Sequence, residues 1–211
     1  IGDDGINRVA YARAKKNGKT VLHAYLGALR RVHILNLNRT EQKAFWINLY
    51  NALTVAMVIE FYPILSIRDI KRAWDRKLIR LQGEMLSLND IEHRILRPIW
   101  RDPLIHYSIS CAALGCPNLA QQAYTGRDLD VMLVRAARDY INHPRGVSIK
   151  DNNLILSKIY GWYADDFGGE AGIRDHLTRY SSSALETKLM LSEGIANFVY
   201  NWKLNYAIEG R

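Results

Sequence analysis

The stretch EQKAFWINLYNALTVAMVIEFYP, residues 41–63, decides the fold because its apolar side chains cover most of the circumference of a helix. A helix that is apolar on nearly all sides lies at the centre of a domain. Thr40 is a residue type that caps helix N-termini, and helices usually end before a proline such as Pro63. The sequence therefore predicts one long, central, buried helix.

Two asparagines are unusual on such a helix. Asn48 and Asn51 are three residues apart and therefore share one face. A buried amide without hydrogen-bond partners costs about 1–3 kcal/mol, so both side chains need partners. Two interpretations remain open: the amides tie a loop to the helix, or they face a functional site.

Helical and extended patterns alternate on both sides of the central helix. Residues 78–88 predict a hairpin around Gln82-Gly83, and residues 87–98 predict a helix that begins with a capping box and ends at Pro98. Residues 7–35 predict a helix whose apolar stripe is formed by Leu22, Tyr25, Leu26, Leu29, Val32 and Leu35.

The second half of the chain continues this mixed pattern. Residues 105–110 are rich in strand-forming residues and predict a buried strand, and residues 125–143 predict an amphipathic helix with Thr125 as its cap. Residues 147–157 predict a second hairpin, and residues 158–169 read as an aromatic loop. This order is typical of an α+β domain.

Composition limits the classes of function. The chain has 211 residues and a net charge of +8, and its longest apolar-rich stretch is interrupted by Asn48, Asn51 and Glu60, so we expect no transmembrane segment. The basic residues are spread along the chain without a recognition motif, which argues against a nucleic-acid partner. No motif in the sequence indicates a cofactor.

The two ends of the sequence carry separate signals. The chain starts with Ile1, so we expect that a signal peptide has been removed, and it ends in IEGR, which reads as an engineered cleavage scar. We therefore expect a helical N-terminal extension over residues 1–38, one domain over residues 39–206 and an engineered tail over residues 207–211.

Five motifs in order along most of the chain resemble the DUF547 family: AFWINLYNALTV, SLNDIEHRILRP, DPLIHYSISCAALGCPNL, LSKIYGWYADDFG and YNWKLN. Members of this family occur widely in bacteria, often with export signals, so the resemblance implies a periplasmic or secreted bacterial protein. It also implies a core like that of papain and the transglutaminases, with a buried helix packed on an antiparallel sheet. Such a core places a cysteine at the start of the helix, where this sequence instead offers Asn48 and Asn51.

The stretch IHYSISCAALGC, residues 105–116, holds the only two cysteines and the histidine His106. The cysteines fit four roles: buried small residues, a disulfide closed by a turn, a nucleophile, or zinc ligands together with His106. The disulfide requires a turn that brings the two Cα atoms within about 7 Å. The spacing matches no standard zinc pattern, so we expect no metal site.

The leading hypothesis is a cysteine-dependent hydrolase or acyltransferase for an amide, peptide or thiol-containing small molecule. Cys116 would be the nucleophile, because Pro117 suits the first turn of a helix whose N-terminus would stabilise the thiolate. His106 would be the base, with Asn48, Asn51 or Glu92 orienting it, and one of the two asparagines could instead serve as an oxyanion donor. Cys111 is the alternative nucleophile.

Other residues are candidates for binding the substrate. Arg97 either forms a salt bridge with Asp102 or binds a carboxylate, and His93 lies beside Glu92 on the same helix. The aromatic residues Trp162 and Tyr163 either form a wall of the site or cover the core. The remaining histidines are most simply surface or core residues: His23, His33, His143 and His176. The alternatives to an enzyme of this class are a non-catalytic binding module and a thiol-redox protein.

Overall fold

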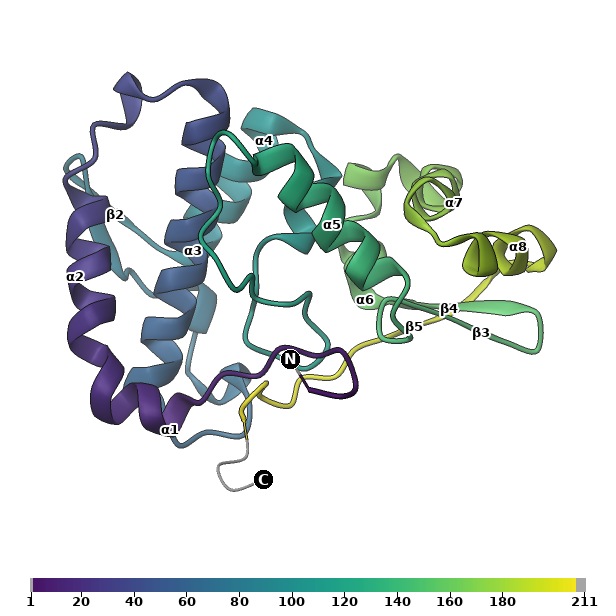
Figure 1. Ribbon diagram of the computed structural model, residues 1–211, viewed down its shortest axis with the longest axis horizontal. Helices are drawn as coiled ribbons and strands as arrows, with labels where there is room; N and C mark the ends of the chain where they lie inside the picture. Colours follow the sequence, from purple (N-terminus) through teal and green to yellow (C-terminus); the bar gives the residue numbers. More distant parts are fainter. Residues whose placement is uncertain (1, 208–211) are drawn as a thin grey trace.

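The computed structural model, described here for residues 2–207, is an α+β protein with two lobes (Figure 1). The first lobe contains α1 (Tyr11–Arg13), η1 (Ala14–Gly18), α2 (Lys19–Arg30), η2 (Ile34–Asn36), α3 (Arg39–Phe61), η3 (Ile67–Asp69), η4 (Ala73–Asp75), β1 (Ile79–Leu81), β2 (Glu84–Leu86), η5 (Asp90–Leu96) and α4 (Arg97–Trp100). The chain then continues through η6 (Pro103–Tyr107), α5 (Leu129–Ile141), β3 (Val147–Lys150), β4 (Asn153–Ser157), α6 (Lys158–Trp162), η7 (Ala164–Phe167), α7 (Gly169–Tyr180), α8 (Ser183–Leu191) and β5 (Ile195–Val199).

Helix α3 is the predicted central helix, and most of its residues are buried. Its N-cap is Asn38 rather than Thr40, because the Asn38 side chain accepts from the Glu41 N–H while the Glu41 carboxylate accepts from the Asn38 N–H. The helix ends at Tyr62, before Pro63, as the sequence predicts. By length and composition α3 could cross a membrane, but 72% of its most apolar window is buried by the rest of the chain, so this is weak evidence for a membrane span.

The expected packing of the central helix on an antiparallel sheet is not found. Helix α3 packs mainly on α2 and on the π-helical turns of η5. The strands instead form a two-stranded hairpin, β1–β2, and a three-stranded sheet in which β4 pairs antiparallel with β3 and parallel with β5. Both predicted hairpins are present, and β1–β2 contributes Ile79, Leu81 and Leu86 to the apolar core around α3.

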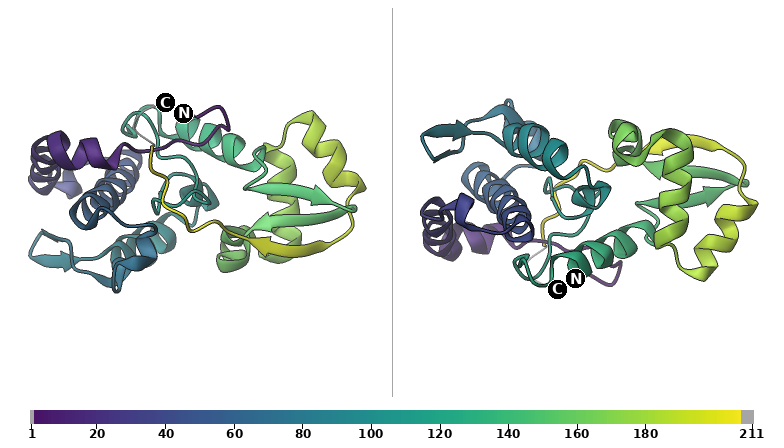
Figure 2. Two further views of the ribbon diagram at one scale, coloured as in Figure 1. Left: turned by 90° about the horizontal axis from the view of Figure 1, so that it is seen from below. Right: turned by 90° about the horizontal axis from the view of Figure 1, so that it is seen from above.

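The two lobes lie side by side in Figure 2, and each has its own apolar core. The first core surrounds α3 and includes residues from Tyr11 to Leu133 together with Leu204. The second lies between α5, the sheet and α7, and its centre is formed by buried aromatic rings such as Tyr107, Tyr140 and Tyr160. Segment η6 and the loop after it connect the two cores.

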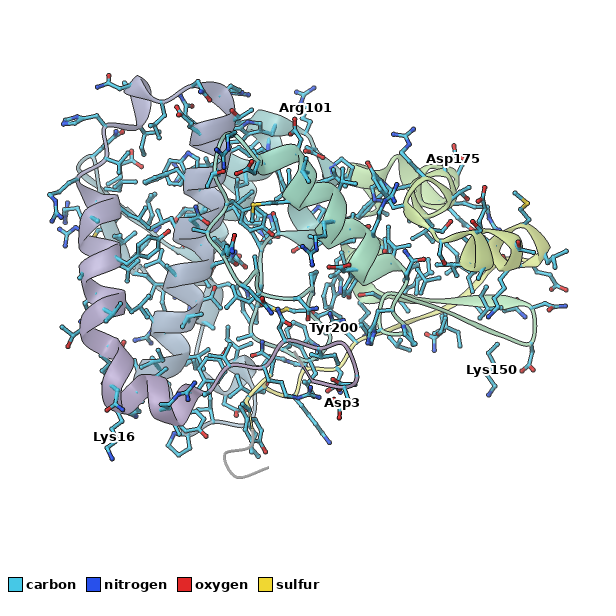
Figure 3. The ribbon with its side chains drawn as sticks, in the orientation of Figure 1. Asp3, Lys16, Arg101, Lys150, Asp175 and Tyr200 are labelled. Atoms are coloured by element: carbon cyan, nitrogen blue, oxygen red, sulfur yellow. A yellow bond between two sulfur atoms is a disulfide. The ribbon has the colours of Figure 1, made fainter. Side chains whose placement is uncertain are left out.

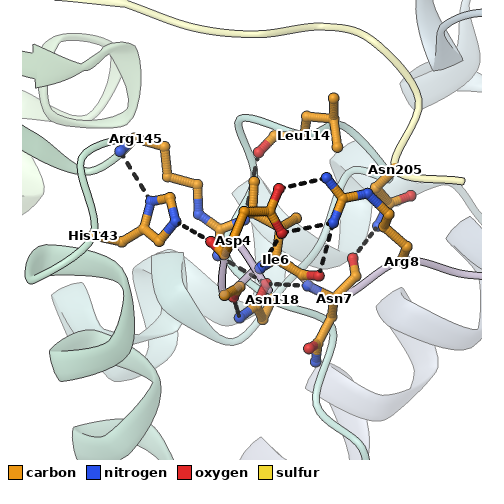
Figure 4. Close-up of polar contacts among 10 residues, drawn as sticks. Asp4, Ile6, Asn7, Arg8, Leu114, Asn118, His143, Arg145 and Asn205 are labelled. Atoms are coloured by element: carbon orange, nitrogen blue, oxygen red, sulfur yellow. Dashed lines mark hydrogen bonds and ion pairs between the residues drawn. The ribbon is translucent and has the colours of Figure 1, made fainter. Parts of the chain in front are cut away.

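The N-terminal residues fasten the first lobe to the loop that follows η6 (Figure 4). The N–H of Asn7 donates to Oδ1 of Asn118 at 2.8 Å, and the Asn7 side chain donates to the carbonyl of Leu119 at 2.8 Å. The carbonyl oxygen of Asp4 lies 2.7 Å from Nε2 of His143, which follows α5. Val9 also forms a bridge to Tyr206, so the start and end of the described chain lie side by side. The predicted N-terminal helix is present from Tyr11 to Arg30, but Leu35 lies beyond it and is exposed. The predicted engineered tail lies, apart from residue 207, outside the described residues.

Three local predictions are wrong, each for a physical reason. The predicted strand over residues 105–110 is instead the 3-10 helix η6 and an irregular segment: Asp102 caps its first turn and Pro103 begins it, and all six residues are buried without alternation. Pro98 lies inside α4 rather than ending it, and the chain turns at Arg101, which has a φ of 49°. The aromatic stretch read as a loop forms the helical turns α6 and η7.

Candidate functional site

A cavity of about 250 Å³ lies at the junction of the two lobes. Tyr200, which Figure 3 labels near the middle of the molecule, belongs to its wall. Polar groups enter the cavity from η5 and η6, and both cysteines line it. Its aromatic lining consists of Tyr50, Trp74, Trp162, Tyr163, Tyr200 and Trp202.

His106 is the buried base candidate of this cavity. The η6 turn carries the ring into the junction, where the side chain is almost fully buried. Its Nε2 lies 2.7 Å from Oδ2 of Asp166, and its ring stacks on Tyr163 at a centroid distance of 4.1 Å. A carboxylate on one ring nitrogen fixes the orientation of the imidazole. It leaves Nδ1 as the nitrogen that can accept a hydrogen bond or a proton from a ligand.

Asp166 is itself held by Arg97. The guanidinium donates from Nε to Oδ2 at 2.6 Å and from Nη2 to Oδ1 at 3.0 Å, which is a bidentate contact. The hydrogen bond with His106 and then the Arg97 contact hold the pKa of Asp166 well below its usual range. The predicted salt bridge from Arg97 to Asp102 is wrong, because Asp102 pairs with the buried Lys43 instead.

Glu92 brings a second carboxyl group to the cavity and is 4% exposed. The hydroxyl of Tyr50 donates to its Oε2 at 3.2 Å, whereas its Oε1 is buried without a hydrogen-bond partner among the described residues. Burial and then the nearby Glu92 carboxyl raise the pKa values of Tyr50 and Tyr163. His93, the next residue, also lines the cavity, and its Nδ1 lies 2.9 Å from Nη1 of Arg97.

The two cysteines form a disulfide whose Cα atoms are 6.1 Å apart. The turn between them is tight: Ala112 has a φ of 61°, a region that residues other than glycine rarely adopt. Gly115 lies against the backbone of Asn201, where an added Cβ would come within 2.8 Å of the nitrogen. No helix begins at Pro117, so the expected stabilisation of Cys116 by a helix N-terminus is wrong.

Two donors nevertheless point at the sulfur of Cys116. The N–H of Cys111 donates to Cys116 Sγ at 2.9 Å, and the hydroxyl of Tyr200 donates to the same sulfur at 3.1 Å. The Tyr200 hydroxyl also lies 3.1 Å from Cys111 Sγ. Cys116 is buried while Cys111 is half-buried, so the two sulfurs differ in both access and surroundings.

The two asparagines of α3 are not among the residues that line this cavity. Asn48 clamps the backbone of Tyr124, donating from Nδ2 to the carbonyl and accepting at Oδ1 from the N–H. Asn51 binds the irregular segment after η6 in the same way: its Nδ2 donates to the carbonyl of Ser108, and its Oδ1 accepts from the N–H of Ser110. Asn51 thereby fixes the segment between His106 and Cys111, which supports the structural interpretation of these amides.

Comparison with known protein families identifies the family of this chain. Residues 34–141, about half of its length, match the family described as "Protein of unknown function, DUF547". The chain belongs to the DUF547 family. Comparisons with curated proteins and with solved structures found no match. The matched segment of this DUF547 protein includes Glu92, His106 and both cysteines, whereas Asp166 and Tyr200 lie beyond it.

The structure brings together most of the predicted site residues of this DUF547 protein. The cavity collects Cys111, Cys116, His106, Glu92 and His93, with Trp162 and Tyr163 as aromatic wall. Arg97 acts on the site through Asp166 instead of lining the cavity.

The sequence interpretation missed Asp166, Tyr200, Trp74 and Trp202. Three of them lie in motifs already noted: Asp166 is in YADDF, and Tyr200 and Trp202 are in YNWKLN. Only folding shows that these motifs meet His106. Among the described residues, no group of three or more histidine, cysteine, aspartate or glutamate side chains is arranged to hold a metal ion.

Proposed function

We propose that this DUF547 protein carries out thiol–disulfide exchange with a small thiol or disulfide that enters the aromatic cavity. The observation that supports this proposal is the pair of donors at Cys116 Sγ, next to a more accessible Cys111. Hydrogen-bond donors stabilise a thiolate, and a sulfur that is stable as a thiolate is a good leaving group.

In this reaction the thiolate of the substrate attacks Cys111 Sγ, and the Cys111–Cys116 bond breaks. The electron pair goes to Cys116 Sγ, which the Cys111 N–H and the Tyr200 hydroxyl stabilise. A second substrate thiol then attacks the mixed disulfide, which releases the oxidised substrate and leaves both cysteines reduced. Nδ1 of His106 accepts the proton of the incoming thiol, and Asp166 holds the imidazole in place.

The rate at which glutathione reduces the native disulfide tests this role. Tyr200→Phe removes one donor at Cys116 and keeps the ring in the wall. We expect roughly a tenfold slower reduction, which corresponds to the loss of about 1.4 kcal/mol of stabilisation. Tyr206→Phe, at an exposed tyrosine near the end of the described chain, is the matched control. An unchanged rate in Tyr200→Phe would contradict the proposal.

A second candidate is acyl transfer by the reduced protein, which the His106–Asp166 pair favours. Cys116 would attack the carbonyl carbon, His106 would protonate the leaving group, and water would then hydrolyse the acyl-enzyme. A burst of p-nitrophenol from p-nitrophenyl acetate, present after reduction and lost in Cys116→Ser and Asp166→Asn, tests it. Ligand binding without exchange or burst would instead support the non-catalytic binding module.

The proposed thiol–disulfide exchange also leads to an expectation about the cellular compartment of the protein. A disulfide persists in oxidising spaces such as the periplasm, so the proposal is consistent with the expected export of this protein. Localisation of a tagged full-length protein by cell fractionation tests this expectation: the protein should appear in the periplasmic or secreted fraction, and recovery only with the cytoplasm would contradict it.

A further inference from the structure

We propose that the cavity binds a small organic cation whose N–H group donates to Glu92. This inference rests on the proposed function only in taking the cavity as the substrate site, because it concerns recognition and not the reactivity of the sulfurs. It names the substrate class: a molecule that carries an ammonium or a similar N–H cation.

The first support is the unpaired oxygen of Glu92. Glu92 is 4% exposed and is one of the residues that line the cavity; Tyr50 donates to its Oε2, and its Oε1 is buried without a partner among the described residues. A buried oxygen without a partner is costly, so a bound N–H donor gains both a hydrogen bond and the relief of that cost. The lone pairs of Oε1 accept hydrogen bonds, so the position selects ligands that donate.

The second support is the charge around the cavity. The protein has a net charge of +8, yet no lysine or arginine is found among the described residues that line this cavity. Asp166, the other acid close by, is already paired with Arg97 and His106. Glu92 is therefore the acidic group that remains for a ligand in the cavity.

The third support is the aromatic wall. Trp162, Tyr200 and Trp202 pack against one another with centroid distances between 4.7 and 5.5 Å. Aromatic faces attract cations, and two rings that line the cavity already do so: Arg97 lies 4.8 Å from the centroid of Tyr163, and Arg68 lies 5.4 Å from that of Trp202. Tyr163 already has Arg97 over its ring and His106 stacked on it. Trp162, Tyr200 and Trp202 are therefore the wall residues that we expect to meet a ligand cation.

Calorimetric titration with three probes of equal chain length tests the inference. We expect n-butylammonium to bind the oxidised protein at least ten times more tightly than n-butanol or n-butyrate. Equal or weaker affinity for n-butylammonium than for n-butanol would overturn the inference, because a cavity without an acceptor for the N–H group favours the neutral alcohol. These probes carry no sulfur, so their binding succeeds or fails independently of thiol exchange.

Two variants locate the site. Glu92→Gln should weaken n-butylammonium binding at least tenfold, and Glu84→Gln, at an exposed glutamate of β2, should leave it unchanged. Trp162→Leu removes a half-exposed wall residue and should also weaken binding, while thermal unfolding confirms that each variant is folded. Full affinity in a folded Glu92→Gln protein would contradict the role of Glu92. Should that variant not fold, the comparison of the three probes on the unaltered protein decides.

Discussion

Two buried histidines, His106 and His176, differ in what their ring nitrogens meet. Both rings stack on a tyrosine, Tyr163 for His106 and Tyr107 for His176. Nε2 of His106 meets the Asp166 carboxylate at the edge of a cavity, whereas Nε2 of His176 meets the Tyr107 hydroxyl at 3.0 Å inside the second core. Burial is common to the two histidines, so the hydrogen-bond partner of each ring and its distance from the cavity are what distinguish His106 as a candidate site residue.

The surroundings of His176 favour its neutral form. Burial, followed by the nearby Arg179, lowers the pKa of His176 to about 4. A neutral ring in an aromatic core stabilises the protein by packing and by its hydrogen bond with Tyr107. The ring of His106, by contrast, meets the Asp166 carboxylate at Nε2, which fixes its orientation beside the cavity.

The largest expected effect is the dependence of stability on pH that His176 causes. Its pKa is about 6.5 in the unfolded chain and about 4 in the folded protein, so the unfolded state binds the proton first as pH falls. Stability should therefore be complete above pH 6.5 and fall by at most about 1.4 kcal/mol per pH unit down to pH 4, a total of roughly 3 kcal/mol.

Urea unfolding between pH 7 and pH 4 measures this effect. His176→Phe keeps an aromatic ring in the core and should flatten the decline in that range. A decline of equal slope in His176→Phe would show that other groups cause it. Asp166 does not interfere, because its pKa is lowered on folding. Its contribution to stability is therefore complete above about pH 4 and is lost only as the pH falls below that value.

The second effect concerns the carboxylate that distinguishes His106. Asp166→Asn leaves Arg97 without its bidentate partner and the His106 ring without an anion. The pair is partly exposed, so we expect a loss of about 2 kcal/mol in the free energy of unfolding instead of the 3–5 kcal/mol of a fully buried pair. Asp165→Asn, at the exposed neighbouring residue, is the control and should change stability by less than about 0.5 kcal/mol.

The smallest effect concerns backbone strain at Ala112, in the turn between the two cysteines that line the cavity. Ala112, between the two cysteines, has a φ of 61°, so Ala112→Gly should stabilise the protein by about 0.5–1 kcal/mol. Ala113→Gly, at the next residue of the same loop, lacks a positive φ and should destabilise it instead. Thermal unfolding measures both, and equal shifts in the two variants would mean that the turn at Ala112 is not strained.

Sequence patterns predicted the elements that depend on local chemistry. The central helix, both hairpins and the capping contacts of Ser87 with Asp90 follow from apolar periodicity, turn residues and hydrogen-bonding side chains close in sequence. The strand expected over residues 105–110 failed because a run of buried residues has no periodicity that separates a strand from a helical turn.

The candidate site depends on contacts between distant segments. His106 and Asp166 are 60 residues apart, and Tyr200 lies 84 residues beyond Cys116. The local sequence does not reveal that His176 is buried, because it lies beside Asp175 and close to Arg179, whereas His106 lies between Ile105 and Tyr107. The residues of the cavity could be named as candidates, but their pairing could not, because it is set by how the two lobes meet.

The most direct test of the reactive cavity is to trap the mixed disulfide. The folded protein is treated with one equivalent of cysteamine, quenched with acid and mapped by peptide mass spectrometry. The account predicts an adduct on Cys111 with Cys116 as a free thiol, because Cys111 is the more accessible sulfur and the Cys111 N–H donates to Cys116 Sγ, which makes Cys116 the leaving group. An adduct on Cys116, or a disulfide that reacts only after the protein is unfolded, would contradict it.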